Sequence, residues 1–200
     1  MMNKRSFVFK VGLLTAGLGL VTAKAFCNGT VVGTIISDLE KHRENAVVSL
    51  KGVAGPVAPR TVIIEQHHLQ FHPKVTTIPA GSTVIFTNHD KLYHNVFSIS
   101  PANEFNIDTY DPGKPVRVKF DRVGVVNLLC KAHPEMSAWV VVTSNSYAAV
   151  SDKSGAFTIR DVPPGTYDVV TWSEKVRQTK VAKVTVSDGK SSHVDVTLGD

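Results

Sequence analysis

Apolar and polar residues alternate along this chain over short runs, and no run has the period of an amphipathic helix. The runs are rich in Val, Ile, Thr and Phe, and clusters of Gly, Pro, Asn and Asp separate them. This pattern is typical of all-β sandwiches. We predict strands over residues 30–36, 46–50, 61–65, 82–88, 95–99, 116–121, 124–129, 138–143, 156–159, 166–172, 181–186 and 193–198, with a polar hairpin connection over residues 39–45.

Two breaks interrupt the series of strands. Residues 51–60 are rich in Gly, Pro and Ala, which indicates a linker, and a second break falls at residues 144–146. The block between them contains most of the histidines and Cys130. We therefore expect a domain over residues 60–142.

The N-terminus has the pattern of an export signal. An apolar run over residues 11–23 follows three basic residues within 4–10 and leads to Ala23-Lys24-Ala25. These features predict a signal peptide over residues 1–25, cleaved after Ala25, by the general secretory or the twin-arginine route. The apolar run is shorter than the roughly 20 residues that a membrane span needs. We expect a periplasmic protein without a membrane span.

Removing the signal peptide changes the charge of the chain. The remainder keeps 18 of the 22 Lys and Arg residues against 17 Asp and Glu, so its net charge is close to zero. A net charge close to zero does not indicate nucleic-acid binding, and the sequence has no basic stripe that would. The ordinary composition, 42% hydrophobic and 20% charged with two cysteines, excludes a disordered chain and a disulfide scaffold.

The strongest chemical signal follows the apolar run that ends at residue 129. Cys130, His133 and Met136 are spaced C-x₂-H-x₂-M, and His94 begins another predicted strand upstream. One thiolate, two imidazoles and a thioether are the ligand set of a blue copper site. Each residue alone is more often structural, but the combination favours copper. Zinc fits less well, because structural zinc avoids Met, and the absence of C-x-x-C-H excludes a c-type haem.

Residues 61–143 resemble the cupredoxins, and the short ligand loop is most similar to that of amicyanin-type members. The matching segments surround the ligands, at residues 71–75, 78–84, 86–90, 94–96 and 120–124. The resemblance implies a Greek-key sandwich with one type 1 copper ion held by His94, Cys130, His133 and Met136. It also implies that Asn95 ties the two ligand loops together and donates a hydrogen bond toward the Cys130 sulfur.

The flanking segments resemble a carboxypeptidase-regulatory-like, or transthyretin-like, sandwich. Residues 29–50 match its opening, and residues 151–167 match its later part with the turn sequences Asp-Lys-Ser-Gly and Pro-Pro-Gly. The resemblance implies one smaller sandwich made of residues 26–59 and 143–200, with the cupredoxin domain inserted into it. The alternative is a tandem arrangement with a disordered N-terminal arm.

A second group of histidines precedes the cupredoxin core. If residues 66–72 form one strand, His68 and His72 share a face and His67 points the other way. We treat His67, His68 and His72 as a candidate second, weaker metal site, with a solvated strand end as the alternative. His89 is not expected to be a ligand. Cys27 is expected to be an unpaired thiol if Cys130 binds copper.

These features favour an electron carrier that docks transiently with redox partner proteins, with His133 as the electron port. Copper storage or delivery is the alternative, and residues 66–72 would serve it. An enzyme acting alone is not expected, because the paired-histidine motifs of a second copper centre, H-x-H or H-C-H, are absent from the sequence.

Overall fold

The structure is a computed structural model that describes residues 27–199 except residues 56, 177, 180 and 181. The predicted signal peptide therefore lies outside the described residues. The all-β prediction is confirmed, since the described part is built of strands and one short 3₁₀ helix, η1 (Glu40–His42). No helix in the described part has the length and apolar character needed to cross a membrane.

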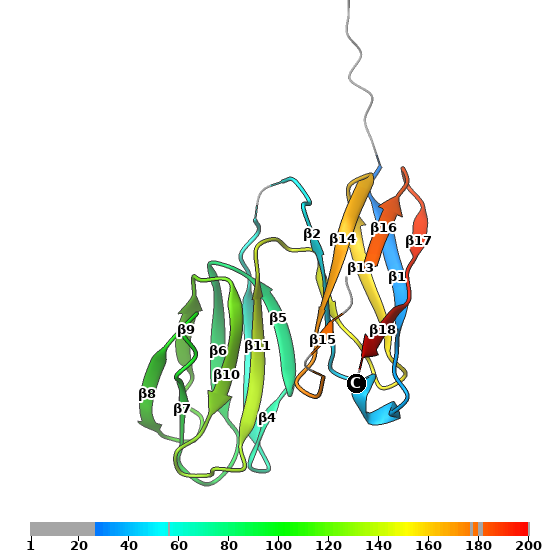
Figure 1. Cartoon of the computed structure of the whole chain (residues 1–200). Coiled ribbons are helices and arrows are strands. Elements are labelled where there is room, and N and C mark those ends of the chain that lie inside the picture. Colours follow the sequence, from blue (N-terminus) through cyan, green and yellow to red (C-terminus); the bar gives the residue numbers. More distant parts are fainter. Residues whose placement is uncertain (1–26, 56, 177, 180–181, 200) are drawn as a thin grey trace, which may run out of the picture.

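Residues 61–143 form one sandwich of two sheets (Figure 1). The first sheet has the order β5 (Val75–Pro79), β11 (Ser137–Thr143), β10 (Gly124–Leu129), β7 (His94–Ser98) and β8 (Phe105–Tyr110). The second has the order β4 (Gln70–His72), β3 (Thr61–His67), β6 (Ser82–Asn88) and β9 (Val116–Phe120).

Alternation along the strands builds the core of this sandwich. In β6, buried residues occupy every second position and include Val84 and Phe86. They pack with Phe71, Phe120 and Leu128 from both sheets. Cys130 and Met136 belong to the same buried cluster, so the ligand loop is anchored to the core at one end of the sandwich.

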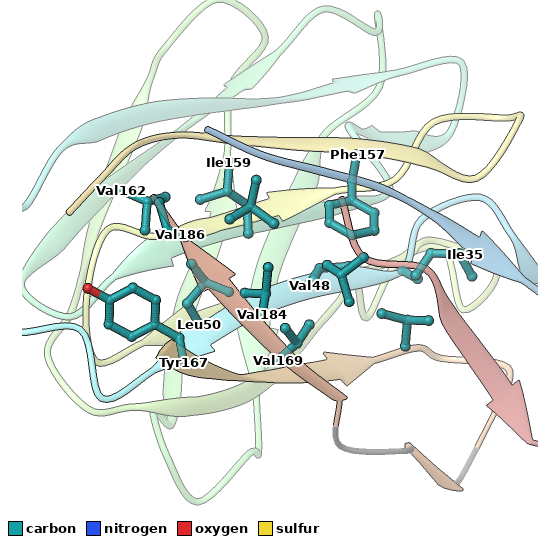
Figure 2. Close-up of a cluster of buried hydrophobic side chains, with 14 of the residues drawn as sticks. Ile35, Val48, Leu50, Phe157, Ile159, Val162, Tyr167, Val169, Val184 and Val186 are labelled. Atoms are coloured by element: carbon teal, nitrogen blue, oxygen red, sulfur yellow. The ribbon is translucent and has the colours of Figure 1, made fainter. Parts of the chain in front are cut away.

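The other strands form a second, smaller sandwich. One sheet has the order β13 (Ala156–Val162), β1 (Gly29–Ile36), β18 (Val196–Gly199) and β15 (Gln178–Thr179), and β17 (Ser191–His193) also pairs with β1. The other has the order β12 (Ala148–Val150), β2 (Val47–Lys51), β14 (Gly165–Trp172) and β16 (Ala182–Val186). Figure 2 shows its apolar core, which includes Ile35, Leu50, Phe157 and Val169.

Strands β1 and β2 precede the larger sandwich in the sequence but pair with strands that follow it. Both occupy internal positions in their sheets, between C-terminal neighbours. This pairing is the one that an inserted cupredoxin domain requires, and it differs from a tandem arrangement with a disordered N-terminal arm. The segment at residues 39–45 connects two sheets rather than forming the predicted hairpin.

The two sandwiches face each other through β2 and β14 on one side and β5, β10 and β11 on the other (Figure 1). Val47, Val75 and Val141 form a small buried cluster there. The Lys74 ammonium lies 3.9 Å from the Glu174 carboxylate across the same interface. A cavity of about 540 Å³ lies between the sandwiches and is lined by residues of both, including Val125, Val170 and Trp172.

Candidate metal centre

Three neighbouring strands bring the predicted ligands to one end of the larger sandwich. Strand β10 pairs with both β7 and β11. His94 is the first residue of β7, Cys130 directly follows β10, and Met136 directly precedes β11. His133 lies in the loop between Cys130 and Met136, where the backbone N–H of Met136 donates to its carbonyl at 2.9 Å.

The side chains of His94, Cys130 and His133 converge. The Nδ1 atoms of His94 and His133 lie 3.1 Å apart, and each lies 3.9 Å from the Cys130 sulfur. Bonds of about 2.0–2.3 Å to a first-row metal place the three donors of a trigonal site about 3.5–3.8 Å apart. The observed triangle is close to this size. In the part of the chain that the structure describes, it is the only group of three His, Cys or acidic residues found close enough to hold a metal.

Burial distinguishes the four predicted ligands. His94, Cys130 and Met136 are almost inaccessible, with exposed fractions of 0%, 3% and 1%. His133 is partly exposed. A soft sulfur donor set enclosed in an apolar core suits a metal such as copper, and His133 is the ligand that reaches the surface.

Asn95 joins the two ligand segments. Its Oδ1 accepts a hydrogen bond from the backbone N–H of Lys131 at 2.7 Å, which ties β7 to the loop after Cys130. The same oxygen lies 3.4 Å from the Cys130 sulfur, with the thiol as donor. A thiolate that binds a metal has no proton to donate, so a hydrogen bond from Asn95 to the sulfur stays a prediction of the resemblance.

Asp90 orients the His94 ring, and the sequence analysis did not identify it. Its carboxylate lies 2.9 Å from His94 Nε2 and accepts the backbone N–H groups of His68 and Leu69 at 2.7 and 3.1 Å. Burial alone would raise the pKa of Asp90, but these hydrogen bonds outweigh it and hold the pKa below its ordinary value. A ring that donates through Nε2 keeps the Nδ1 lone pair for a metal.

The candidate second site does not assemble as predicted. Residues 66–72 are not one strand, because His68 and Leu69 form the turn of a hairpin with φ of 53° and 57°. The predicted faces were therefore wrong: His67 pairs with Gln70, and His72 lies on the same exposed face. His67, His68 and His72 do not form a group close enough to hold a metal among the described residues.

Two family models match parts of the chain, one over the larger sandwich and one mainly over the C-terminal strands of the smaller sandwich. Residues 59–143 match the model for copper binding proteins of the plastocyanin/azurin family. These residues are therefore similar to the cupredoxins over the part of the chain that the sequence resemblance indicated. Residues 134–199 match the model for the carboxypeptidase regulatory-like domain. The overlap at residues 134–143 covers the end of the ligand loop and β11, which pairs within the cupredoxin sandwich.

Amicyanin-alpha of Methylorubrum extorquens is a curated relative, 34% identical over 77 residues. The match spans 37% of this chain and 65% of the length of that relative. The sequence analysis named amicyanin-type cupredoxins as the members that the ligand loop resembles. That resemblance and the copper cofactor are confirmed by the family models and by this relative.

Solved structures similar to this chain include a copper-containing nitrite reductase from Thermus scotoductus, at 25% identity and a TM-score of 0.40. That match covers 48% of this chain and 25% of the reductase. A purple cupredoxin from Nitrosopumilus maritimus is 26% identical with a TM-score of 0.37, over 41% of this chain and 99% of its own.

Proposed function

We propose that the protein is an exported type 1 (blue) copper protein that carries single electrons between periplasmic redox partners. The convergence of one thiol and two imidazoles at 3.1–3.9 Å supports this proposal most directly. His94, Cys130, His133 and Met136 would hold copper. Copper bound there would supply one-electron chemistry between Cu(I) and Cu(II).

Rigid elements hold the donors in place for this role. His94 is part of a strand and its ring is fixed by Asp90, while Asn95 fixes the backbone after Cys130. Donors that move little between oxidation states favour rapid electron transfer. The protein contributes this constancy through its hydrogen bonds and its packed core.

His133 is the proposed electron port because it is the partly exposed ligand. Leu92 and Tyr93, directly before His94, are 51% and 59% exposed and offer an apolar docking surface beside the centre. Small apolar surfaces of this kind suit brief encounters with redox proteins. In this proposal the chain is an electron carrier, not an enzyme acting alone.

We assign residues 26–59 and 143–200 to one split domain, with the cupredoxin domain over residues 60–142 inserted into it. The pairing of β1 and β2 with C-terminal strands supports this division. Both chain crossings lie at one end of the cupredoxin sandwich, and the ligand loop lies at the other end (Figure 1). The split domain would thus position the copper end toward partners.

Spectroscopy tests the proposal. The chain is expressed from Phe26, loaded with Cu(II) and compared with Cys130→Ser by visible absorption and EPR. We expect an intense thiolate-to-copper band with a narrow hyperfine splitting in the native protein and neither in the variant. A colourless native protein, or an ordinary weak copper spectrum, would contradict the proposal.

Copper storage or delivery is the second candidate. Exposed imidazoles gather near Asp90: the His67 and His68 rings are stacked at 3.8 Å, and His89 lies 6.3 Å from His67. Such groups could pass a metal ion to or from the centre. If a chelator removes copper from the native protein within seconds, this candidate replaces electron transfer.

A further inference from the structure

Gln66 is a polar residue in a position that the strand pattern reserves for apolar side chains. In β3 the inward residues Ile64 and Gln66 both have an exposed fraction of 0%. A buried amide destabilises the fold unless its oxygen and its nitrogen both find partners. Its hydrogen bonds therefore indicate what it does.

The Gln66 amide connects three strands in two different sheets. Its Oε1 accepts the hydroxyl hydrogen of Tyr110, at the end of β8. Its Nε2 donates to the backbone carbonyl of Asn95, in β7, at 3.3 Å. The two sheets of the sandwich are thus joined by a polar bridge at the end where the ligands lie.

The bridge continues to the ligand loop through Asn95. The Asn95 side chain accepts the backbone N–H of Lys131, the residue that follows Cys130. Tyr110 also pairs with His94 in the register between β7 and β8. Both ligand segments are therefore connected to the bridge.

We propose that Gln66 and Tyr110 are positioning residues of the copper centre. They fix the backbone at Asn95, and Asn95 in turn fixes the loop after Cys130 relative to the strand of His94. This inference rests on the proposed copper centre but concerns residues that do not bind the metal. Loosening the bridge would let the Cys130 loop move relative to His94, with the ligands themselves unchanged.

Two variants break the bridge at different points. Tyr110→Phe removes the hydroxyl with little change of shape, and Gln66→Leu removes the amide. In the metal-free protein, we expect the Lys131 amide hydrogen to exchange about tenfold faster by NMR in both variants. In the copper-loaded protein, we expect a changed EPR hyperfine splitting and about tenfold faster loss of copper to a chelator.

Tyr167→Phe is the matched control. The Tyr167 hydroxyl donates to the Pro163 carbonyl at 2.9 Å in the other sandwich, and the residue is buried to the same degree as Tyr110. Its loss is expected to lower the unfolding temperature without changing the spectrum or the exchange of Lys131.

The inference is overturned if Tyr110→Phe folds and leaves both the Lys131 exchange rate and the copper spectrum as in the native protein. If Gln66→Leu fails to fold, the near-isosteric Tyr110→Phe still decides. A native protein that shows no blue copper spectrum would overturn the proposed function instead. The exchange rate of Lys131 in the metal-free protein would still report on the bridge.

Discussion

Trp139 and Trp172 pack against each other across the interface of the two sandwiches, with ring centroids 5.3 Å apart and planes inclined at 54°. They are the two tryptophans of the sequence. Trp139 lies in β11, three residues after Met136, and Trp172 is the last residue of β14 in the split sandwich. Because both indoles lie at this contact, the tryptophan fluorescence of the protein reports on how the sandwiches are joined.

Trp172→Ala is expected to weaken the interface. A fully buried Trp→Ala change costs about 3–5 kcal/mol, and the partly exposed Trp172 should cost about 2 kcal/mol. Urea unfolding followed by circular dichroism measures the loss. Ile99→Ala is the control, because Ile99 is 72% exposed. Equal unfolding midpoints for the native protein and Trp172→Ala would show that the contact adds nothing to stability.

Asp90→Ala should weaken copper binding about 10–100-fold, the usual effect of removing the partner of a ligating histidine. The change frees the His94 ring and leaves the N–H groups of the His68–Leu69 turn without their acceptor. Competition with a chelator of known affinity measures the effect. Asp108→Ala, at an exposed position of β8, is the control and should bind copper like the native protein. Unchanged affinity in Asp90→Ala would mean that the ring is held by packing alone.

Met136→Gln should lower the reduction potential while copper stays bound. An amide oxygen is a harder donor than a thioether and favours Cu(II) over Cu(I). Cyclic voltammetry of the native and variant proteins measures the shift. A potential that stays the same or rises would show that Met136 does not act as an axial ligand, and that its burial serves packing alone.

Asp152 should give the split sandwich a pH-dependent stability. The hydroxyl of Ser154 lowers the pKa of Asp152, burial opposes this effect, and backbone N–H groups of Ser154 and Ala156 add to the lowering. The ionised carboxylate thus stabilises the folded state. Its contribution is present above the unfolded pKa of about 3.8 and is lost as the pH falls through the lower folded pKa.

Asp152→Asn removes the charge at every pH. We expect it to melt below the native protein at pH 7, with the difference shrinking as the pH falls below 3.8 and through the lowered folded pKa of Asp152. Differential scanning calorimetry across this range measures both curves. A constant difference at all pH values would assign the effect to the shape of the turn rather than to its charge.

The ligand spacing could be predicted from the sequence because most of it is local. Cys130, His133 and Met136 lie within one short loop, and the strand that begins at His94 shows the usual alternation. The β-sandwich class, which is confirmed, follows from the same alternation of apolar and polar residues. The assignment of the individual ligands stays a prediction until metal is bound to the protein.

Contacts between distant residues were harder to predict. The turn at His68 and Leu69 carries none of the Asn or Gly residues that usually mark such hairpins, because Asp90, more than 20 residues away, supplies its acceptor. The predicted strand over residues 193–198 is two strands, since Asp195 between them accepts the backbone N–H of Thr34. Gln66 could have been found from the sequence, because it is a polar residue at a position that the alternation assigns to the inward face.

The pairing of β2 with β12 has a consequence for the order in which the chain folds. Strand β1 must find β13, β17 and β18 across more than 100 residues, which is a slow search for an open chain. The cupredoxin sandwich consists of consecutive residues and can fold first. Once folded, it holds its own two ends near each other, because the Arg60 carbonyl accepts the backbone N–H of Thr83 and the Thr143 carbonyl accepts that of Ala80. The cupredoxin domain would then act as a folding nucleus that brings the two segments of the split sandwich together.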